Sequence, residues 1–191
     1  LVLTVDAPLS GLRYRQQQAG FVLPPDCQPA HPMPQTAPRS SDPNAQIFAG
    51  WMAQAPVWDD VYWLCRQTRL PLWLKGITHP ADAQTALQCG VAGLIVSNHG
   101  GRVLDGTPAS LTLLPLIRQA LPPQVPLLLD GCVRRGSDVF RALALGASAV
   151  LLGRPALYGL ATAGALGVAH VLRLLQEELA MTMALCGCAT V

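Results

Sequence analysis

The stretch Gly93-Leu-Ile-Val-Ser-Asn-His-Gly-Gly-Arg102 decides the fold, because a continuous apolar run leads directly into a glycine-rich run of reactive side chains. Three other apolar runs end in a comparable way: residues 72–74 before Lys75, 125–129 before Asp130-Gly131, and 149–152 before Gly153-Arg154. Strands that are buried on both faces form such unbroken apolar runs. In a parallel α/β barrel all strands open their carboxyl ends onto one face, where active sites are built. The pattern therefore predicts an enzyme whose lysine, histidine, arginine and aspartate side chains converge on one mouth.

Helical segments separate these runs and extend the pattern to both ends of the chain. Residues 1–5 form another strand-length apolar run. Apolar periodicity and end signals predict helices at residues 57–68, 78–90, 110–120 and 137–145, and a last helix at about 167–186. Five successive strand–helix units imply a parallel sheet with right-handed crossovers. Because five strands cannot close an eight-stranded barrel, the sheet should have two open edges. We expect the missing strands before Leu1.

Residues 19–56 differ in character from the rest of the chain. Eight of the 17 prolines fall in this segment, so a regular helix or a central strand is excluded there. A long segment of this kind in a compact domain is usually a functional lid or a disordered loop. Both interpretations stay open.

Composition excludes several classes of function. The chain has 191 residues, of which 51% are hydrophobic and 13% charged, and its net charge of +2 gives no basic surface for nucleic acid. The longest apolar stretch, residues 155–169, is shorter than the roughly 20 residues that span a bilayer. No secretory signal is visible, so we expect a cytoplasmic protein. The six cysteines lack metal-ligand spacing, which favours reduced thiols over a disulfide set and predicts no metal site.

Two successive strand ends carry the features of a phosphate site. Gly131 and Gly153 allow backbone N–H groups to approach phosphate oxygens, while Arg134 and Arg154 supply planar guanidinium groups for bidentate contact. The alternative is that both arginines form surface ion pairs. Because the feature recurs at neighbouring strand ends, the sequence favours phosphate.

Lys75 and His99 are the candidates for covalent or acid–base chemistry. Lys75 ends an apolar strand, where it could form a Schiff base or remain a cation beside developing negative charge. A lysine that merely extends its ammonium group into solvent is the alternative. His99 lies beside glycines that let a substrate approach, and imidazole titrates near neutral pH, which suits a general base. His31, His79 and His170 have no comparable setting.

Together these segments resemble the signatures of the FMN-dependent α-hydroxy-acid dehydrogenases and oxidases, a family that includes glycolate oxidase, lactate oxidase, and L-lactate and mandelate dehydrogenases. The matching segments are Trp73-Leu-Lys-Gly76, Ser97-Asn-His-Gly-Gly-Arg102, Asp130-Gly-Cys-Val-Arg-Arg-Gly136 and Gly153-Arg-Pro155. Thr4-Val-Asp6, followed by Arg13, resembles the fourth-strand motif. The resemblance implies an α/β fold, a partial (β/α)8 TIM barrel with strands 4 to 8, their helices and a long proline-rich loop after strand 4. Residues 1–191 would then be the C-terminal portion of one barrel.

The resemblance also implies FMN as cofactor and the oxidation of a small L-2-hydroxy acid, such as lactate or glycolate, to the 2-oxo acid. His99 would take the hydroxyl proton while the α-hydrogen passes to flavin N5, as a hydride or after a carbanion. Arg13 and Arg102 would bind the substrate carboxylate, and Asp6 would support His99. Lys75 would stabilise the anionic reduced flavin. The other implied cofactor contacts are Thr4 and Ser97 to the flavin, and Asp130, Gly131, Cys132, Val133, Arg134, Gly153 and Arg154 to the ribityl chain and phosphate.

Two features depart from the family pattern. Cys132 stands where the family usually has glycine, so its side chain could crowd the phosphate loop or strain a position of positive φ. The family's first three strands, which supply backbone contacts to the flavin and a substrate-binding tyrosine, are absent from this chain.

Three functional hypotheses follow. The first is the hydroxy-acid oxidase or dehydrogenase, for which the resemblance leaves a homotetramer open because relatives are often tetramers. The second is a phosphate-binding barrel aldolase or isomerase that uses Lys75 as a Schiff base. The third is a truncated, catalytically incomplete remnant. The sequence determines neither the hydroxy acid nor the electron acceptor, which could be oxygen, a quinone or a cytochrome.

Overall fold

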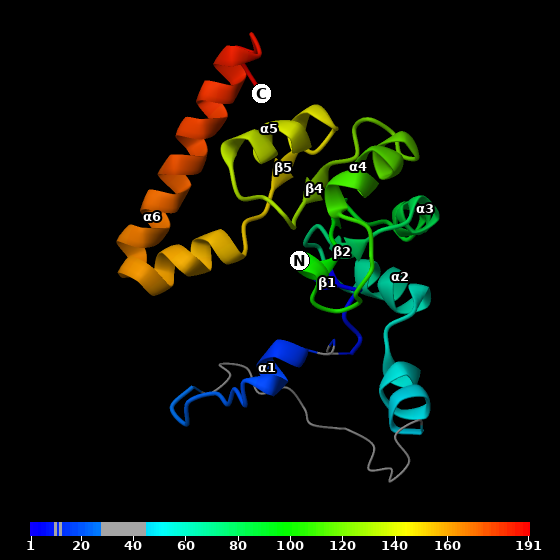
Figure 1. Cartoon of the computed structure of the whole chain (residues 1–191). Coiled ribbons are helices and arrows are strands. Elements are labelled where there is room, and N and C mark those ends of the chain that lie inside the picture. The colour runs from blue at the N-terminus through cyan, green and yellow to red at the C-terminus, as the bar shows by residue number, and fades with distance from the viewer. Residues whose placement is uncertain (10, 12, 28–44) are drawn as a thin grey trace.

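Five parallel strands form one sheet in chain order, β1-β2-β3-β4-β5 (Figure 1). The computed structural model describes residues 1–9, 11, 13–27 and 45–191. The strands are β1 Val2–Thr4, β2 Trp73–Ile77, β3 Gly93–Val96, β4 Leu127–Leu129 and β5 Ala149–Val150. Every neighbouring pair is parallel. The predicted α/β class and the five predicted strands are confirmed, and within the described chain β1 and β5 are open edges of the sheet.

Four of the connecting helices lie along one side of the curved sheet (Figure 1). They are α2 Trp58–Gln67, α3 Pro80–Gln88, α4 Ser110–Gln119 and α5 Gly136–Ala144. Local chemistry explains where they begin. The Asp60 carboxylate accepts a hydrogen bond from the Val57 N–H at 2.8 Å before α2. His79 Nδ1 accepts from the Ala81 N–H at 3.2 Å, and Pro80 opens α3 with a φ suited to a first helical residue. All four helices were predicted within two residues of their bounds.

The core lies between the three central strands and these helices. All four residues of β3 are buried. The least exposed large side chains are Leu74, Leu94, Val96, Leu114, Ile117, Leu127 and Leu129. Burying one such side chain contributes about 1.5–3 kcal/mol, so the central strands hold the sheet together. The edges are more open: Val2 is 53% exposed in β1, and Leu151, directly after β5, is 37% exposed.

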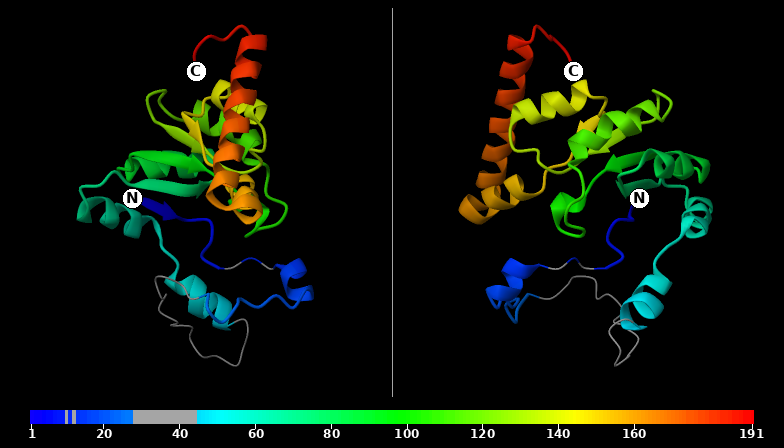
Figure 2. Two further views of the ribbon diagram at one scale, coloured as in Figure 1. Left: turned by 90° about the vertical axis from the view of Figure 1, so that its left-hand side faces the viewer. Right: turned by 45° about the vertical axis from the view of Figure 1, so that its right-hand side comes forward.

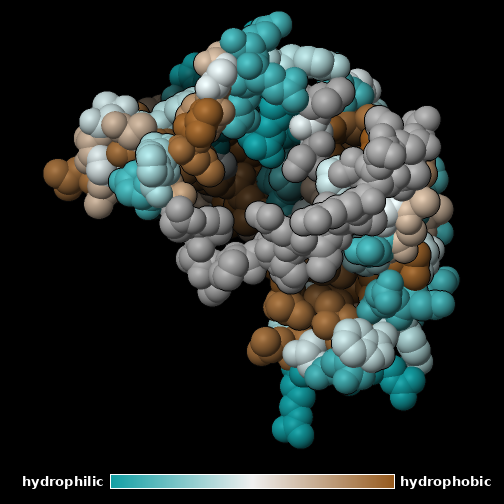
Figure 3. Space-filling model, turned by 90° about the horizontal axis from the view of Figure 1, so that it is seen from below, coloured by the Kyte–Doolittle hydropathy of each residue, from teal (hydrophilic) through white to brown (hydrophobic). Residues whose placement is uncertain are grey.

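The segment between β1 and α2 contains short helical turns that the sequence did not predict. They are α1 Tyr14–Gln18, the π-helix η1 Ala45–Trp51 and the 3-10 helix η2 Met52–Gln54. The expected lid or disordered loop at 19–56 is therefore helical at 45–54, and its residues 28–44 lie outside the described residues. In Figures 1 and 2, α1 and the residues after it stand away from the sheet. Phe21, Val22 and Phe48 are exposed there, and the face in Figure 3 shows hydrophobic side chains beside hydrophilic ones.

The last helix, α6 Arg154–Leu185, consists of two segments that fold back on each other. The backbone leaves helical geometry at Ala163 (φ −147°) and Gly164 (φ 58°). Gly159 and Gly167 pack closely across this break, since a Cβ on Gly159 would lie 2.6 Å from the Gly167 carbonyl oxygen. The second segment packs on α5, where Arg135 forms a 2.9 Å ion pair with Glu178.

By length and apolar composition alone, α6 could cross a membrane. Its mean hydropathy of 1.4 over the most apolar window meets that test, and few of its side chains are buried. The break at Gly164 nevertheless divides the helix, and the Glu178–Arg135 ion pair ties its second segment to α5. These are the contacts of a helix whose second segment packs on α5. The absence of a membrane span stays a prediction.

Candidate active site

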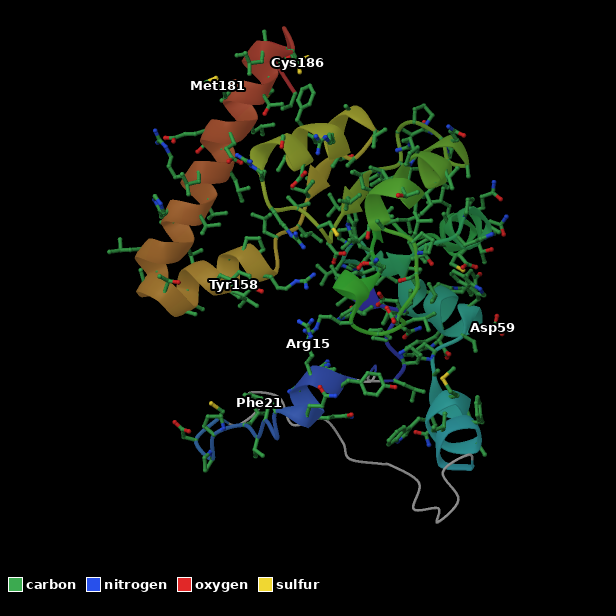
Figure 4. All side chains as sticks on the ribbon, in the orientation of Figure 1. Arg15, Phe21, Asp59, Tyr158, Met181 and Cys186 are labelled. Atoms are coloured by element: carbon green, nitrogen blue, oxygen red, sulfur yellow. The ribbon has the colours of Figure 1, made fainter. Side chains whose placement is uncertain are left out.

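The carboxyl ends of the strands surround a cavity of about 640 Å³, a volume typical of ligand sites. The parallel register brings residues from distant parts of the chain to this one face, as the predicted convergence requires. The predicted site residues that line the cavity are Lys75, His99, Arg102, Asp130, Gly131, Cys132, Val133, Arg134, Gly153 and Arg154. Figure 4 shows the side chains on the ribbon.

An ion pair crosses the centre of the sheet at the floor of the cavity. β2 continues two residues beyond Lys75, which the sequence placed at the strand end. Lys75 Nζ lies 2.8 Å from Oδ2 of Asp130, the residue after β4. It also donates to Ser97 Oγ, after β3, at 2.9 Å. The two charged side chains are only 20% and 17% exposed, and Ser97 is fully buried. An ammonium group has three donors, so one remains for a ligand.

Asp130 also offers an unused acceptor. Its Oδ1 is buried and has no hydrogen-bond partner among the described residues. Leaving a buried carboxylate oxygen unpaired is costly, which makes it ready to accept from a ligand hydroxyl in the adjoining cavity. The Lys75–Asp130 pair thus presents both a donor and an acceptor to the same space.

His99 is oriented by a carboxylate from the edge of the sheet. Its Nδ1 lies 3.1 Å from Oδ1 of Asp6, which follows β1. Because the carboxylate accepts, the ring hydrogen lies on Nδ1 and Nε2 is left to receive a proton. The His99 N–H donates to Ser97 Oγ at 3.0 Å, and the backbone of His99 has a φ of 55°. Such a left-handed conformation is uncommon outside glycine and is held here by these contacts.

Space for the Asp6 carboxylate comes from the neighbouring strand. A Cβ on Gly76 of β2 would lie 2.5 Å from both Cβ and Cγ of Asp6. Gly76 also has a φ of 108°, in the region that side chains rarely adopt. Only glycine at this position lets the aspartate reach the imidazole.

The loop after β4 forms the second wall of the cavity. Gly131 has a φ of 87° and Cys132 a φ of 61°, so cysteine occupies a left-handed position, as the comparison with glycine at this site anticipated. Such a conformation costs a non-glycine residue about 1–2 kcal/mol. The end of the loop is fixed by Asp138, whose Oδ2 accepts from the N–H groups of Arg134 and Arg135, both at 3.1 Å.

Two guanidinium groups remain available at this wall. Arg134 and Arg154 are exposed, and neither has a carboxylate within ion-pair distance in the part of the chain that the structure describes. The geometry therefore does not support the alternative that these two arginines form surface ion pairs. Arg154 opens α6 directly after Gly153 and donates to the Gly100 carbonyl oxygen at 3.3 Å.

Four predicted residues do not line the cavity. Ser97 and Asp6 lie behind Lys75 and His99 and act through them. Thr4 ends β1 opposite Lys75 in the sheet register. Arg13 is exposed at the N-cap of α1, and the structure does not bring it to the cavity.

The structure adds residues that the sequence reasoning did not find. Leu151, Leu152, Pro155, Leu157 and Tyr158 line the cavity next to the phosphate wall. Figure 4 labels Tyr158 on the first segment of α6. Its position four residues after Arg154 places both on one helix face, a signal that the sequence contained.

The cysteines do not form a second site. All six are free thiols. Burial raises the pKa of Cys65 and of Cys89, so both thiols stay protonated at neutral pH. Among residues 1–9, 11, 13–27 and 45–191, no group of three or more histidine, cysteine or acidic side chains could hold a metal ion.

Comparison with known proteins identifies the family. The model of the family described as FMN-dependent dehydrogenase matches residues 1–191. The chain belongs to this family. It is 54% identical to an L-lactate oxidase of Alicycliphilus denitrificans, over 99% of this chain and 53% of that protein. It is 46% identical to a peroxisomal (S)-2-hydroxyacid oxidase of Arabidopsis thaliana, over 100% of this chain and 53% of that one.

Solved structures agree with the fold. A mandelate oxidase matches 98% of this chain and 50% of its own, with a TM-score of 0.80 and 40% identity. The chain thus spans about half the length of the relatives it matches, and its sheet is a partial TIM barrel with the five strands described above. Membership in this family removes the aldolase or isomerase hypothesis. The Lys75–Asp130 ion pair agrees, since a Schiff-base lysine must be neutral to attack a carbonyl.

The cavity fits FMN, the cofactor of this family. The unpaired guanidinium groups of Arg134 and Arg154, with the glycine-rich loop, suit a phosphate. The orphan Asp130 Oδ1 suits a hydroxyl of the ribityl chain, and the free donor of Lys75 suits an electron-rich ring edge. These are the residues that would hold the cofactor.

Proposed function

We propose that the protein oxidises a small L-2-hydroxy acid to the corresponding 2-oxo acid, with FMN as cofactor. The observation that carries this proposal is the His99–Asp6 pair, 3.1 Å apart, at the rim of a cavity that also contains Lys75 and two free arginines. Relatives named L-lactate oxidase and (S)-2-hydroxyacid oxidase support the substrate class. Their names also favour oxygen as the electron acceptor.

FMN supplies a two-electron acceptor when it is bound. The chain's own groups supply the rest. His99 Nε2 takes the proton of the substrate hydroxyl, and Asp6 stabilises the imidazolium that this produces. Arg102, at the rim, binds the substrate carboxylate and orients the α-carbon. Lys75 places a fixed positive charge on the floor, where it stabilises negative charge more strongly than it would in water.

Arg13 keeps its proposed role as a second carboxylate-binding group. For that role α1 must bring it to the cavity, because the described position of Arg13 at the N-cap of α1 is exposed. Substitution of Arg13 by lysine should then raise the KM for the hydroxy acid more than it lowers kcat, whereas Arg102→Lys should affect both.

The test uses the protein as its gene encodes it. We expect flavin absorption after purification or after addition of FMN, and turnover of L-lactate or glycolate with oxygen, a quinone or a cytochrome as acceptor. His99→Gln should lower kcat by about 10²–10⁴-fold with FMN still bound. The matched control is His79→Gln, because His79 lies at the start of α3, outside the cavity, and should leave kcat unchanged.

Three outcomes would contradict the proposal. Bound FMN without turnover of any 2-hydroxy acid, or no FMN binding at all, would favour the truncated remnant. Trapping of a substrate on Lys75 by borohydride would revive the Schiff-base hypothesis.

A further inference from the structure

A hydrogen bond joins the two functional ends of the cavity. Arg154 Nη2, at the phosphate wall, donates to the carbonyl oxygen of Gly100 at 3.3 Å. Gly100 follows His99 directly, and all three residues line the same cavity. The bond connects the end of β5 with the loop after β3, although the two residues are 54 positions apart.

Glycine at position 100 leaves room for the contact. Gly100 has a φ of 65°, and a Cβ there would lie 3.2 Å from Arg154 Nη2. With no side chain in the way, the guanidinium group lies directly against the backbone of the loop. Any larger residue would crowd Arg154 and strain the backbone.

The other bonds of the loop do not reach the phosphate wall. The His99 and Gly100 N–H groups donate to Ser97 Oγ and Asn98 Oδ1, both close in sequence. The imidazole is held by Asp6 from the opposite edge of the sheet. Arg154 therefore provides the link between this loop and the wall that would hold the phosphate.

Arg154 can make that link and bind an anion at the same time. A guanidinium group has five N–H donors in a planar fork, and the Gly100 carbonyl uses one of them. Within the described residues Arg154 has no carboxylate partner and its one hydrogen bond goes to the Gly100 carbonyl, so its other donors can bind an anion in the cavity that it lines.

We propose that Arg154 is a positioning residue for His99: one guanidinium group holds both the cofactor phosphate and the Gly100 carbonyl, so phosphate binding orders the loop that carries the base. This inference rests on the proposed function, because it takes the anion to be the phosphate of FMN. Beyond the proposed function, the inference states that phosphate binding fixes the position of the His99 loop at the reacting end of the cavity, in addition to contributing to the affinity for FMN.

Amide hydrogen exchange tests the inference in the protein as its gene encodes it. The probes are inorganic phosphate, which occupies only the phosphate wall, and FMN. Mass spectrometry measures amide exchange, at constant ionic strength, in a peptide that covers residues 99–103. In the wild type we expect phosphate to slow exchange in this peptide at least threefold. In Arg154→Lys, whose ammonium group lacks the planar fork and the reach needed to contact the phosphate and the Gly100 carbonyl together, the slowing should disappear.

Arg134→Lys is the matched control. Arg134 lines the same wall, but it makes no described contact with the His99 loop. Both lysine variants should weaken FMN binding by about tenfold, measured by flavin fluorescence, because each loses a bidentate contact. Only Arg154→Lys should lose the phosphate-dependent protection of residues 99–103. A merely structural role for Arg154 would change exchange equally with and without phosphate.

The outcomes separate the two proposals. If FMN binds and Arg134→Lys and Arg154→Lys affect the loop alike, or neither affects it, the inference is wrong while the proposed function stands. If the wild type binds neither FMN nor phosphate, both fail.

Discussion

The centre and the edges of the sheet hold the site in different ways. Strands β2, β3 and β4 have partners on both sides, and Leu74, Leu94 and Leu127 in them are completely buried. The edge strands β1 and β5 have three and two residues and are partly exposed. In the centre, Lys75, Ser97 and Asp130 form a bonded group across three strands. At the edges, Asp6 and Arg154 each reach the His99 loop through a single contact.

The central residues and the edge residues therefore have different roles in the site. The central group sets a fixed charge inside a rigid core, because its members are both buried and bonded to one another. The edge groups orient the base and the phosphate end through single bonds of 3.1 and 3.3 Å, which small shifts can alter. The four predictions below test whether this contrast between centre and edge holds.

The largest effect is expected in the central core. Leu94→Ala removes a completely buried side chain from β3 and should lower the free energy of unfolding by about 2–5 kcal/mol. Leu151→Ala, at the open edge, should cost less than about 1 kcal/mol, because that side chain is already 37% exposed. Urea denaturation of both variants measures the difference. Equal losses would mean that the edge is covered in the folded protein.

The central ion pair should matter next. Asp130→Asn leaves the Lys75 ammonium group without its carboxylate at a site only 20% exposed, so we expect a loss of about 2 kcal/mol. The exposed pair Arg173–Glu177 is the control, and Glu177→Gln should change stability by less than about 0.5 kcal/mol. Urea denaturation near neutral pH distinguishes them. A loss for Asp130→Asn no larger than that for the surface pair would contradict the buried charge pair.

A smaller and opposite effect is expected at the phosphate loop. Cys132→Gly removes a side chain from a position with a φ of 61° and so removes backbone strain. The greater flexibility of glycine in the unfolded chain offsets part of this gain in stability. The net result should be a stabilisation of about 0.5–1 kcal/mol, with tighter FMN binding. Thermal unfolding and flavin fluorescence measure both. Cys132→Val should have the opposite sign, and a destabilised glycine variant would show that the thiol makes a contact of its own.

The smallest effect concerns pH and the anchor of α6. The pKa of Glu178 is lowered, first by its hydrogen bonds from Arg135 and then by that from the Gly136 N–H. Its stabilising contribution is therefore complete above the ordinary pKa of 4.5 and is lost as the pH falls through the lower value of the folded state. Denaturation of wild type and Glu178→Gln should differ at pH 7 and converge in acid. A constant difference would exclude titration of Glu178 as the cause.

The sequence predicted the centre of the molecule better than its edges for a physical reason. Strands buried on both faces leave unbroken apolar runs, as at residues 93–96, and helices with one apolar face leave periodic patterns, as at residues 110–119. Both signals are local in sequence. The short helix at Tyr14–Gln18 has no buried residue and hence no such pattern. The helical turns at residues 45–54 were not predicted, because the prolines before and after them argue against a helix in the segment as a whole.

The candidate site was predictable where it follows strand ends. Lys75, His99, Asp130 and Arg154 each come within three residues after an apolar run, and a parallel sheet must bring such positions together. Arg13 lies on a connection whose course depends on contacts far along the chain, so no pattern near it specifies its position. Tyr158 was missed because its spacing from Arg154, the one signal for it, indicates a shared helix face but not that this face lines the cavity.

Gly76 shows that a residue can be essential to a site without contacting a ligand itself. A single methyl group added there would collide with Asp6 and displace the carboxylate that holds the imidazole of His99, and under the proposed function this would slow turnover. A geneticist who maps loss-of-function changes in this protein would then find a damaging substitution at a residue with no side chain and no ligand. The absence of a side chain at Gly76 is therefore as necessary to the proposed site as the side chains around it.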